Sequence, residues 1–324
     1  MCTCITFKER DFYFGRNLDL ETSFGEKVVI TPRKYKFELK NKSVYENKYA
    51  IIGMASIIDN YPLYADAANE KGLCMAGLYF PGNAIYNEEK EGKNNITSFE
   101  LIPWILGRCI NIIEVKKELE KINITNKSFN EKIPTVQLHW MVSDENQSIV
   151  IEQMKDGLNI YDNPYGVLTN NPPFYYHEIN INNYINISSN VATNRFSKKL
   201  KLKGYGQGMG MIGLPGDVTP TSRFIRASFN KFNSAKCQNE EDTVSQFFHI
   251  LDSVSMIKGT VITENDKDDM TIYSSCINTK KGTYYFKTYY NNQINAVSFN
   301  NKNLNSKSLD IYNLPLKQKY NYLN

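Results

Sequence analysis

The chain has 324 residues, of which 41% are hydrophobic and 22% are charged, a composition typical of a globular protein with a sizeable core. Its formal net charge is +4, and basic and acidic residues are interleaved, which argues against a nucleic-acid-binding module with a basic stripe. Residues 1–20 carry charges where a signal peptide needs an apolar run, and no apolar stretch reaches the ~18 residues of a membrane span. We therefore expect a cytoplasmic protein with neither nucleic acid nor membrane as a partner.

The first third of the chain is predicted to form β-strands. Short runs of β-branched and aromatic residues, bounded by polar turns, occur at 2–7, 12–16, 27–32 and 49–57. The next stretch, 64–80, is expected to form two strands on either side of a tight turn, in which Gly72 supplies a positive φ.

Two pairs of helices interrupt the strands. The helical spacing of apolar residues predicts them at 98–109, 112–122, 222–235 and 241–254, and Ser98 is the expected N-cap of the first. Strands are expected between and after these pairs, at 137–144, 148–154, 157–163, 166–173, 270–278, 282–292 and 294–299. The glycine-dense loop at 204–217 lacks the strand and helix context of a nucleotide site, and we expect it to form a wall of the substrate pocket.

This order of elements predicts the fold class. The chain is predicted to begin with strands, which are followed by a helix pair, further strands, a second helix pair and a last set of strands. Few strand–helix–strand alternations occur. That order argues against a doubly wound parallel sheet and favours an α+β protein, in which helices cover the outer faces of two stacked, mainly antiparallel sheets. Because no repeat or linker interrupts the pattern, residues 1–324 are predicted to form a single domain.

Cysteines and histidines are scattered along the chain. No C-x-x-C pair occurs, so free thiols are expected rather than a disulfide framework. The residues are Cys2, Cys4, Cys74, Cys109, Cys237, Cys276, His139, His177 and His249. Cys2 and Cys4 share one face of a strand, but no histidine stands near another in the sequence, and we expect no metal site.

The cysteine after the initiator methionine is the first candidate for chemistry. Methionine is generally removed before a small residue, and its removal would give Cys2 a free α-amine beside its own thiol. An α-amine with a pKa of ~7.7–8.0 can accept a proton near neutral pH, and a thiolate can attack an amide carbonyl to form an acyl-enzyme. The plainer interpretation is that Cys2 begins an ordinary buried strand.

The second predicted strand brings charged residues toward Cys2. Arg16 and Asp19 lie in the stretch "GRNLD", which can pair with the first strand as a hairpin. A guanidinium beside the thiol would favour the thiolate, and a carboxylate beside the α-amine would orient it. From these residues alone, a surface ion pair between Arg16 and Asp19 is an equally good interpretation.

The motifs taken together resemble the choloylglycine hydrolase family. Met-Cys-Thr at the start is followed in order by "FGRNLD", "NEKGLCMAGL", "GVLTNNP", "GLPGD" and "SRF", and the resemblance runs essentially from end to end. Members of this family are conjugated bile acid hydrolases and penicillin V acylases. The resemblance implies a four-layer αββα N-terminal nucleophile hydrolase fold, a homotetramer, and hydrolysis of a small-molecule linear amide without metal or organic cofactor.

The resemblance also assigns residues to the site. Cys2 matches the nucleophile, and Arg16 and Asp19 match the positions beside it. Asn170, in "LTNNP", matches the side chain that helps to form the oxyanion hole, and Arg223, in "SRF", matches the active-site arginine of the late helix.

Tyr79 departs from the bile salt hydrolase pattern. Those enzymes typically carry "AGLNF", whereas this chain has "AGLYF", which resembles the penicillin V acylase branch. Two other stretches, "PGNA" and "FELIPWILG", instead resemble the bile salt hydrolases of intestinal lactobacilli. The bulk of Tyr79 would narrow the acyl pocket and suit a flat phenoxyacetyl group, although its backbone N–H could still serve an oxyanion hole. We therefore favour penicillin V acylase activity, with hydrolysis of glycine- or taurine-conjugated bile acids as the alternative. Tyr79 could also point elsewhere.

Two further interpretations belong to other classes. One is a thiol hydrolase that uses Cys74, Cys109 or Cys276 together with a histidine, and the other is a binding protein on an inactive hydrolase fold. The presence of Cys2, Arg16, Asp19, Asn170 and Arg223 together weighs against the second, because binding alone would not require the whole set.

The use of the α-amine as a base requires a free N-terminus at Cys2. We predict that the intact mass of the active enzyme lacks one methionine, as measured by mass spectrometry. Full activity in a preparation shown to retain Met1 would contradict this mechanism.

Overall fold

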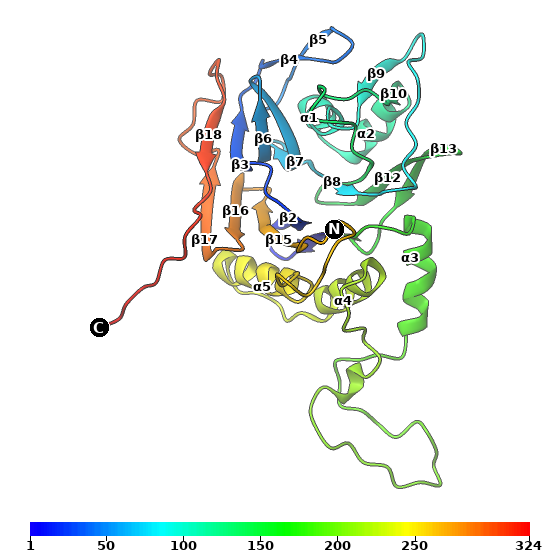
Figure 1. The fold of residues 1–324 in the computed structure, drawn as a ribbon. Helices are drawn as coiled ribbons and strands as arrows, with labels where there is room; N and C mark the ends of the chain where they lie inside the picture. The colour runs from blue at the N-terminus through cyan, green and yellow to red at the C-terminus, as the bar shows by residue number, and fades with distance from the viewer.

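Two antiparallel sheets stacked face to face form the centre of the computed structural model, which describes residues 1–324 (Figure 1). The smaller has six strands in the order β14-β1-β2-β15-β16-β17, formed by Val167–Leu168, Cys2–Lys8, Phe12–Leu20, Met270–Asn278, Thr283–Thr288 and Asn291–Ser298. The larger has eight in the order β13-β12-β11-β8-β7-β6-β3-β18, formed by Gly157–Asp162, Ser148–Met154, Leu138–Ser143, Cys74–Tyr79, Tyr61–Asn69, Ile51–Ile58, Lys27–Thr31 and Asp310–Asn313.

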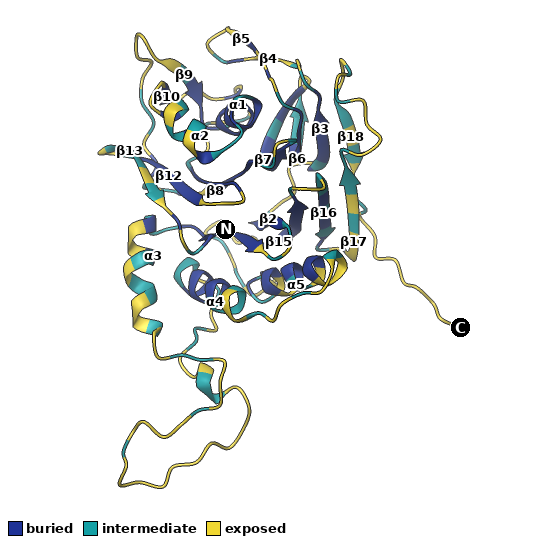
Figure 2. Cartoon of the chain, turned by 180° about the vertical axis from the view of Figure 1, so that it is seen from behind, coloured by how far each residue is buried: buried dark blue, intermediate teal, exposed yellow.

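Helices cover the outer faces of both sheets. α1 (Leu101–Arg108) and α2 (Ile112–Leu119) pack on the eight-stranded sheet, and α4 (Pro220–Asn233) and α5 (Glu240–Asp252) pack on the six-stranded sheet (Figures 1 and 2). α3 (Phe174–Asn180) lies beside α4. The expected α+β class and four-layer αββα arrangement are therefore confirmed. That residues 1–324 make one domain stays a prediction.

The first helix pair is shorter than the apolar spacing predicted. α1 begins after Glu100 rather than at Ser98, because the Glu100 carboxylate accepts hydrogen bonds from the backbone N–H groups of Thr97, at 2.8 Å, and Lys40, at 2.7 Å. Ile122 leaves the helical pattern and begins a strand that pairs in parallel with residues 94–97. The hydrogen bond from Lys40 at one end and the strand pairing at the other thus override the local helical periodicity.

Several short elements were not predicted from the sequence. α3 is one of them, and the others are β4 (Lys36–Glu38), β5 (Val44–Glu46), β9 (Asn94–Thr97), β10 (Ile122–Thr125), β18 and the 3₁₀ turns η1 (Ile181–Tyr184) and η2 (Met209–Met211). The predicted tight turn is present, and Gly72 has a φ of +88°.

The segment between α3 and α4 extends away from the sheets (Figure 1). Its side chains are largely exposed, as the yellow ribbon in Figure 2 shows, and they include Phe196 and Tyr205. The glycine-dense loop lies within this segment, and its assignment as a pocket wall stays a prediction. No helix in the chain is both long and apolar enough to cross a membrane.

Gly15 marks the tightest approach between strands β2 and β15. An added Cβ at Gly15 would lie 2.0 Å from the backbone oxygen of Ser275 and 2.6 Å from its carbonyl carbon. Real Cβ atoms do not approach a backbone so closely, so only glycine lets the two central strands pair here.

We predict that Gly15→Ala lowers the free energy of unfolding by about 3 kcal/mol, because the backbone must shift to make room in a packed core. Urea denaturation measures the change. Gly206→Ala is the matched control, since an added Cβ there meets nothing within 4 Å, and it should leave stability nearly unchanged. Equal stability of the two variants would show that the close approach at Gly15 is not constraining.

Candidate active site

Strand register brings Cys2 and Asn170 together. β1 pairs antiparallel with β14, and Cys4 lies opposite Leu168, so Cys2 continues the register opposite residue 170. The backbone N–H of Cys2 donates to the Asn170 Oδ1 at 2.8 Å. Only 3% of Cys2 is exposed to solvent. The predicted nucleophile and the predicted oxyanion-hole residue are therefore neighbours.

Arg223 completes this contact from the helical layer. It lies in the first turns of α4, whose N-cap Thr219 accepts a hydrogen bond from the N–H of Ser222. The fully buried guanidinium donates through Nη2 to the Asn170 Oδ1 at 2.8 Å, and through Nη1 to the carbonyl of Cys2 and to the Thr3 Oγ1. Arg223 thus fixes both the first strand and the Asn170 carboxamide. Burial lowers its pKa, and the Asp19 carboxylate opposes that shift.

Asp19 is buried at the end of the second strand. Its Oδ1 accepts a hydrogen bond from the Thr271 hydroxyl at 2.6 Å, while its Oδ2 is buried without a partner. Burial raises the pKa of this carboxyl, and the charges of Arg223 and of the N-terminus act in the opposite direction. A buried carboxylate oxygen with no partner beside the chain terminus is an acceptor available to an ammonium group.

Arg16 crosses from the six-stranded to the eight-stranded sheet. Its Nη1 donates to the carbonyls of Gly77, at 2.5 Å, and Ala65, at 3.1 Å. Burial lowers the pKa of Arg16, but its surroundings, which include the buried Asp66 carboxylate, outweigh burial and raise that pKa overall. Arg16 and Asp19 are both fully buried, and each has its own partners, so the surface ion pair considered for them is wrong.

Asp66 is a buried charged residue that sequence reasoning missed. It faces the space between the sheets and accepts hydrogen bonds from the hydroxyls of Tyr273, at 2.5 Å, Tyr284, at 2.6 Å, and Ser275, at 3.0 Å. Burial raises its pKa, and Arg16 is the largest opposing influence. The available signal was an aspartate inside the apolar strand "YADAAN", where a charge needs a buried counterpart.

The structure contains Met1, and Met1 is held at both ends of its backbone. Its ammonium group lies 3.2 Å from the Asp269 Oδ2 and donates to the carbonyl of Asp19 at 2.5 Å. The carbonyl of Met1 accepts from the N–H of Asp19 at 2.9 Å. The residue before Cys2 therefore lies against the end of the second strand, held by the backbone of Asp19 and the carboxylate of Asp269.

The Tyr79 side chain and backbone face different surroundings. Tyr79 pairs with Leu138, and Leu138 packs against the cluster beneath α1 and α2, so register places both side chains on the outer face of the eight-stranded sheet. The Tyr79 side chain is 44% exposed. Its carbonyl, in contrast, accepts a hydrogen bond from the Asn170 Nδ2 at 2.8 Å. This placement favours the interpretation that the Tyr79 ring points away from Cys2 and Asn170, while the Tyr79 backbone lies beside Asn170.

The other cysteines are poorly suited to nucleophilic chemistry. Cys74, Cys109 and Cys276 are buried, and burial raises the pKa of each thiol, to about 12 for Cys109. None of them hydrogen-bonds to a histidine, and His249 is exposed on α5. The geometry gives no support to a thiol hydrolase built on these residues.

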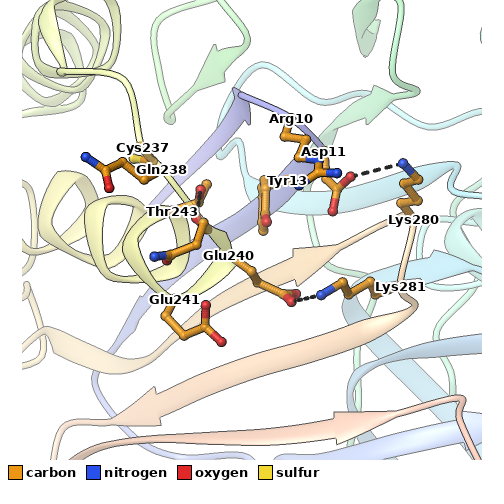
Figure 3. A pocket seen from close by; sticks show the side chains of 11 residues that line it. Arg10, Asp11, Tyr13, Cys237, Gln238, Glu240, Glu241, Thr243, Lys280 and Lys281 are labelled. Atoms are coloured by element: carbon orange, nitrogen blue, oxygen red, sulfur yellow. Dashed lines mark hydrogen bonds and ion pairs between the residues drawn. The ribbon is translucent and has the colours of Figure 1, made fainter.

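Two other features could mark a competing site, namely a metal-binding cluster and a surface cavity. No group of three or more His, Cys, Asp or Glu side chains is placed to hold a metal ion. A surface cavity of about 590 Å³ lies near the start of α5 (Figure 3), but its walls are charged side chains such as Arg10, Glu240 and Lys281, and it does not include Cys2.

Comparison with known proteins agrees with the class that the fold defines, the N-terminal nucleophile hydrolases. The family of linear amide C–N hydrolases known as the choloylglycine hydrolase family matches residues 2–312. The chain belongs to this family and is an enzyme that hydrolyses linear amides.

Similar proteins cover the whole chain. A bile salt hydrolase/transferase from Lactiplantibacillus plantarum is 50% identical over 324 residues, and one from Clostridium perfringens is 42% identical over 331 residues, each with full coverage of both chains. The structure of a conjugated bile acid hydrolase from Clostridium perfringens matches with a TM-score of 0.94 at 40% identity, covering 100% of both chains. A penicillin V acylase from Agrobacterium tumefaciens, with a TM-score of 0.77, shares the fold at 19% identity over 96% of this chain and 90% of its own.

His177, which lies on α3, is fully buried, and its Nε2 lies 3.2 Å from the carbonyl oxygen of Asn170. Burial lowers the pKa of its imidazole from 6.5 to about 4. In the unfolded chain this ring takes up a proton below about pH 6.5, whereas in the folded chain it does so only near pH 4. Acid therefore favours the unfolded chain between these values.

We predict that the wild type loses about 2 kcal/mol of unfolding free energy between pH 7 and pH 5 relative to His177→Gln, which cannot take up this proton. Urea denaturation of both proteins across this range measures the difference, and the variant removes the contribution of carboxylates common to both. Parallel pH profiles would mean that His177 titrates in the fold as it does in the unfolded chain.

Proposed function

We propose that this enzyme cleaves the amide bond of conjugated bile acids and releases glycine or taurine. The observation that carries the proposal is end-to-end similarity, at 50% and 42% identity, to two proteins named bile salt hydrolase/transferase. The cluster of Cys2, Asn170 and Arg223 at the chain terminus supports it, because the backbone of the thiol-bearing residue contacts a carboxamide and a cation.

The proposed nucleophile is the Cys2 thiolate, once Met1 has been removed. The new α-amine then lies where the Cys2 N–H now meets the Asn170 Oδ1, and the unpartnered Asp19 Oδ2 is available to accept from it. Arg16, a buried cation on the strand that pairs with the one carrying Cys2, is the proposed counter-charge for the sulfur. Arg223 holds the carbonyl of Cys2 and thereby the start of the strand.

The proposed reaction proceeds through an acyl-enzyme. The thiolate adds to the amide carbonyl, and the negative oxygen that forms is stabilised by the Asn170 Nδ2 and the backbone N–H of Tyr79. The α-ammonium of Cys2 gives its proton to the departing amine as the C–N bond breaks, which leaves a thioester. Water then adds to the thioester, the α-amine accepts a proton from it, and the free bile acid and the thiol are released.

Penicillin V is the second candidate substrate, and the tyrosine in "AGLYF" is the sequence feature that suggested it. The proposed preference for a flat acyl group required the Tyr79 ring to narrow the pocket. Register instead places the ring on the outer face of its sheet, and the similarity to a penicillin V acylase, at 19% identity, concerns the fold alone. We therefore place bile acid conjugates first. Assembly as a homotetramer stays a prediction.

A side-by-side assay tests the choice of substrate. We expect kcat/KM for glycocholate or taurocholate to exceed that for penicillin V by about tenfold or more, since ~1.4 kcal/mol of differential binding suffices for that ratio. Cys2→Ser should lose activity by orders of magnitude on every substrate. Cys4→Ser, the same chemical change two residues along the same strand face, should keep it.

Two outcomes would count against the proposal. Faster cleavage of penicillin V would overturn the substrate assignment and restore the interpretation based on Tyr79. Retention of activity in a folded Cys2→Ser protein, with a mass that lacks Met1, would overturn the assignment of the nucleophile.

A further inference from the structure

Two buried imidazoles bind consecutive backbone carbonyls at the proposed oxyanion hole. The Nε2 of His139, on β11, lies 2.9 Å from the carbonyl oxygen of Thr169. The Nε2 of His177, on α3, lies 3.2 Å from the carbonyl oxygen of Asn170. Both rings are fully buried. Neither histidine has a part in the chemistry proposed above.

These two carbonyls belong to the peptide planes on either side of the Asn170 Cα. A peptide unit is planar, so a hydrogen bond to its carbonyl sets the rotation of the whole plane. With both planes held, the φ and ψ angles of Asn170 are set, and the Cα–Cβ bond can take only one direction. The orientation of the carboxamide is therefore set by its own contacts with Cys2 and Arg223 and also by the hydrogen bonds that fix the backbone of Asn170.

The hydrogen bonds of the His139 ring determine that its Nε2 donates to the Thr169 carbonyl. A carbonyl oxygen only accepts hydrogen bonds, so the Nε2 that faces Thr169 must carry a hydrogen. The Nδ1 faces the Glu152 Oε1 at 2.9 Å, and this oxygen also accepts from the N–H of Phe174 at 3.0 Å. Whether Nδ1 or Oε1 carries the hydrogen that they share, Nε2 keeps its own hydrogen and donates it to the Thr169 carbonyl.

His177 is a fixed donor for a different reason. Its Nδ1 is buried without a hydrogen-bond partner, and burial lowers the pKa of the ring to about 4, so the neutral ring has its single hydrogen on Nε2. The ring stacks on Phe224, with centroids 4.7 Å apart, and Phe224 follows Arg223 in α4. His177 thus connects the backbone of Asn170 to the helix that holds its side chain.

We propose that His139 and His177 are positioning residues that lock the two peptide planes around Asn170 and so aim its carboxamide at the reacting carbonyl. The inference rests on the proposed role of Asn170. Glu152 acts through His139 by fixing which ring nitrogen faces Thr169. The neutral His177 ring adds no charge beside the cations Arg16 and Arg223.

A pair of substitutions at His177 separates positioning from packing. His177→Phe keeps a ring that can stack on Phe224 but has no donor, whereas His177→Gln keeps an N–H at similar reach and has no ring. If the hydrogen bond matters, His177→Phe lowers kcat by about 10- to 100-fold with little change in KM, and His177→Gln stays within about threefold of wild type. His249→Phe is the matched control on the exposed face of α5 and should leave kcat unchanged.

A second variant covers the case in which His177→Phe does not fold. In Glu152→Gln the amide oxygen must stay where Phe174 donates, so the ring of His139 must carry its hydrogen on Nδ1, and Nε2 then presents a lone pair to Thr169. If the side-chain amide of the new glutamine instead rotates so that its nitrogen faces Phe174, the backbone N–H of Phe174 loses its acceptor. We expect kcat to fall about tenfold while circular dichroism stays that of the wild type.

The experiment distinguishes failure of this inference from failure of the proposed function. In the background of Asn170→Ala, the further loss caused by His177→Phe should disappear, because there is no carboxamide left to aim. Wild-type kcat in folded His177→Phe or Glu152→Gln, or a greater loss in His177→Gln than in His177→Phe, would overturn the positioning role alone. Wild-type kcat in Asn170→Ala would overturn the proposed oxyanion hole itself.

Discussion

The antiparallel register of the first strand is the constraint on which the site depends. β1 lies between β14 and β2 inside the six-stranded sheet, and Cys4 is opposite Leu168 on one side and Arg16 on the other. A shift by one residue would turn every side chain of β1 to the opposite face of the sheet. The backbone of Cys2 and the carboxamide of Asn170 meet because this one register holds, and the same register sets Arg16 opposite Cys4 on the neighbouring strand.

The register is in turn maintained by close packing. Gly15, opposite Ile5, allows β2 to approach β15 where any side chain would collide with Ser275. Beyond the sheet, α4 places Arg223 against the backbone of Cys2. The chain terminus, which in most proteins is free to move, is here an interior strand between β14 and β2.

Buried charge is the cost of this arrangement. Arg16, Asp19, Asp66 and Arg223 all lie inside the protein, where an unpaired ion is unfavourable by several kcal/mol. Three hydroxyls stabilise Asp66, and carbonyls and a carboxamide accept from the two arginines. Asp19 retains an unpartnered oxygen, the kind of incompletely satisfied group that marks a site where a further donor is to be bound.

The amino-acid sequence by itself determined the fold class, the family and the residues to examine, because strand and helix periodicity is local and the motifs lie in order along the chain. It could not determine where Tyr79 points or that Arg16 and Asp19 are buried, since both depend on which strand lies alongside. The pairing of Tyr79 with Leu138 assigns its ring to the outer face. Some contacts arise only when the sheets and helices pack, because no local pattern in the chain encodes them. One is the contact between Cys2 and Asn170, which are more than a hundred residues apart, and another is the approach of His139 and His177 to the carbonyls of Thr169 and Asn170.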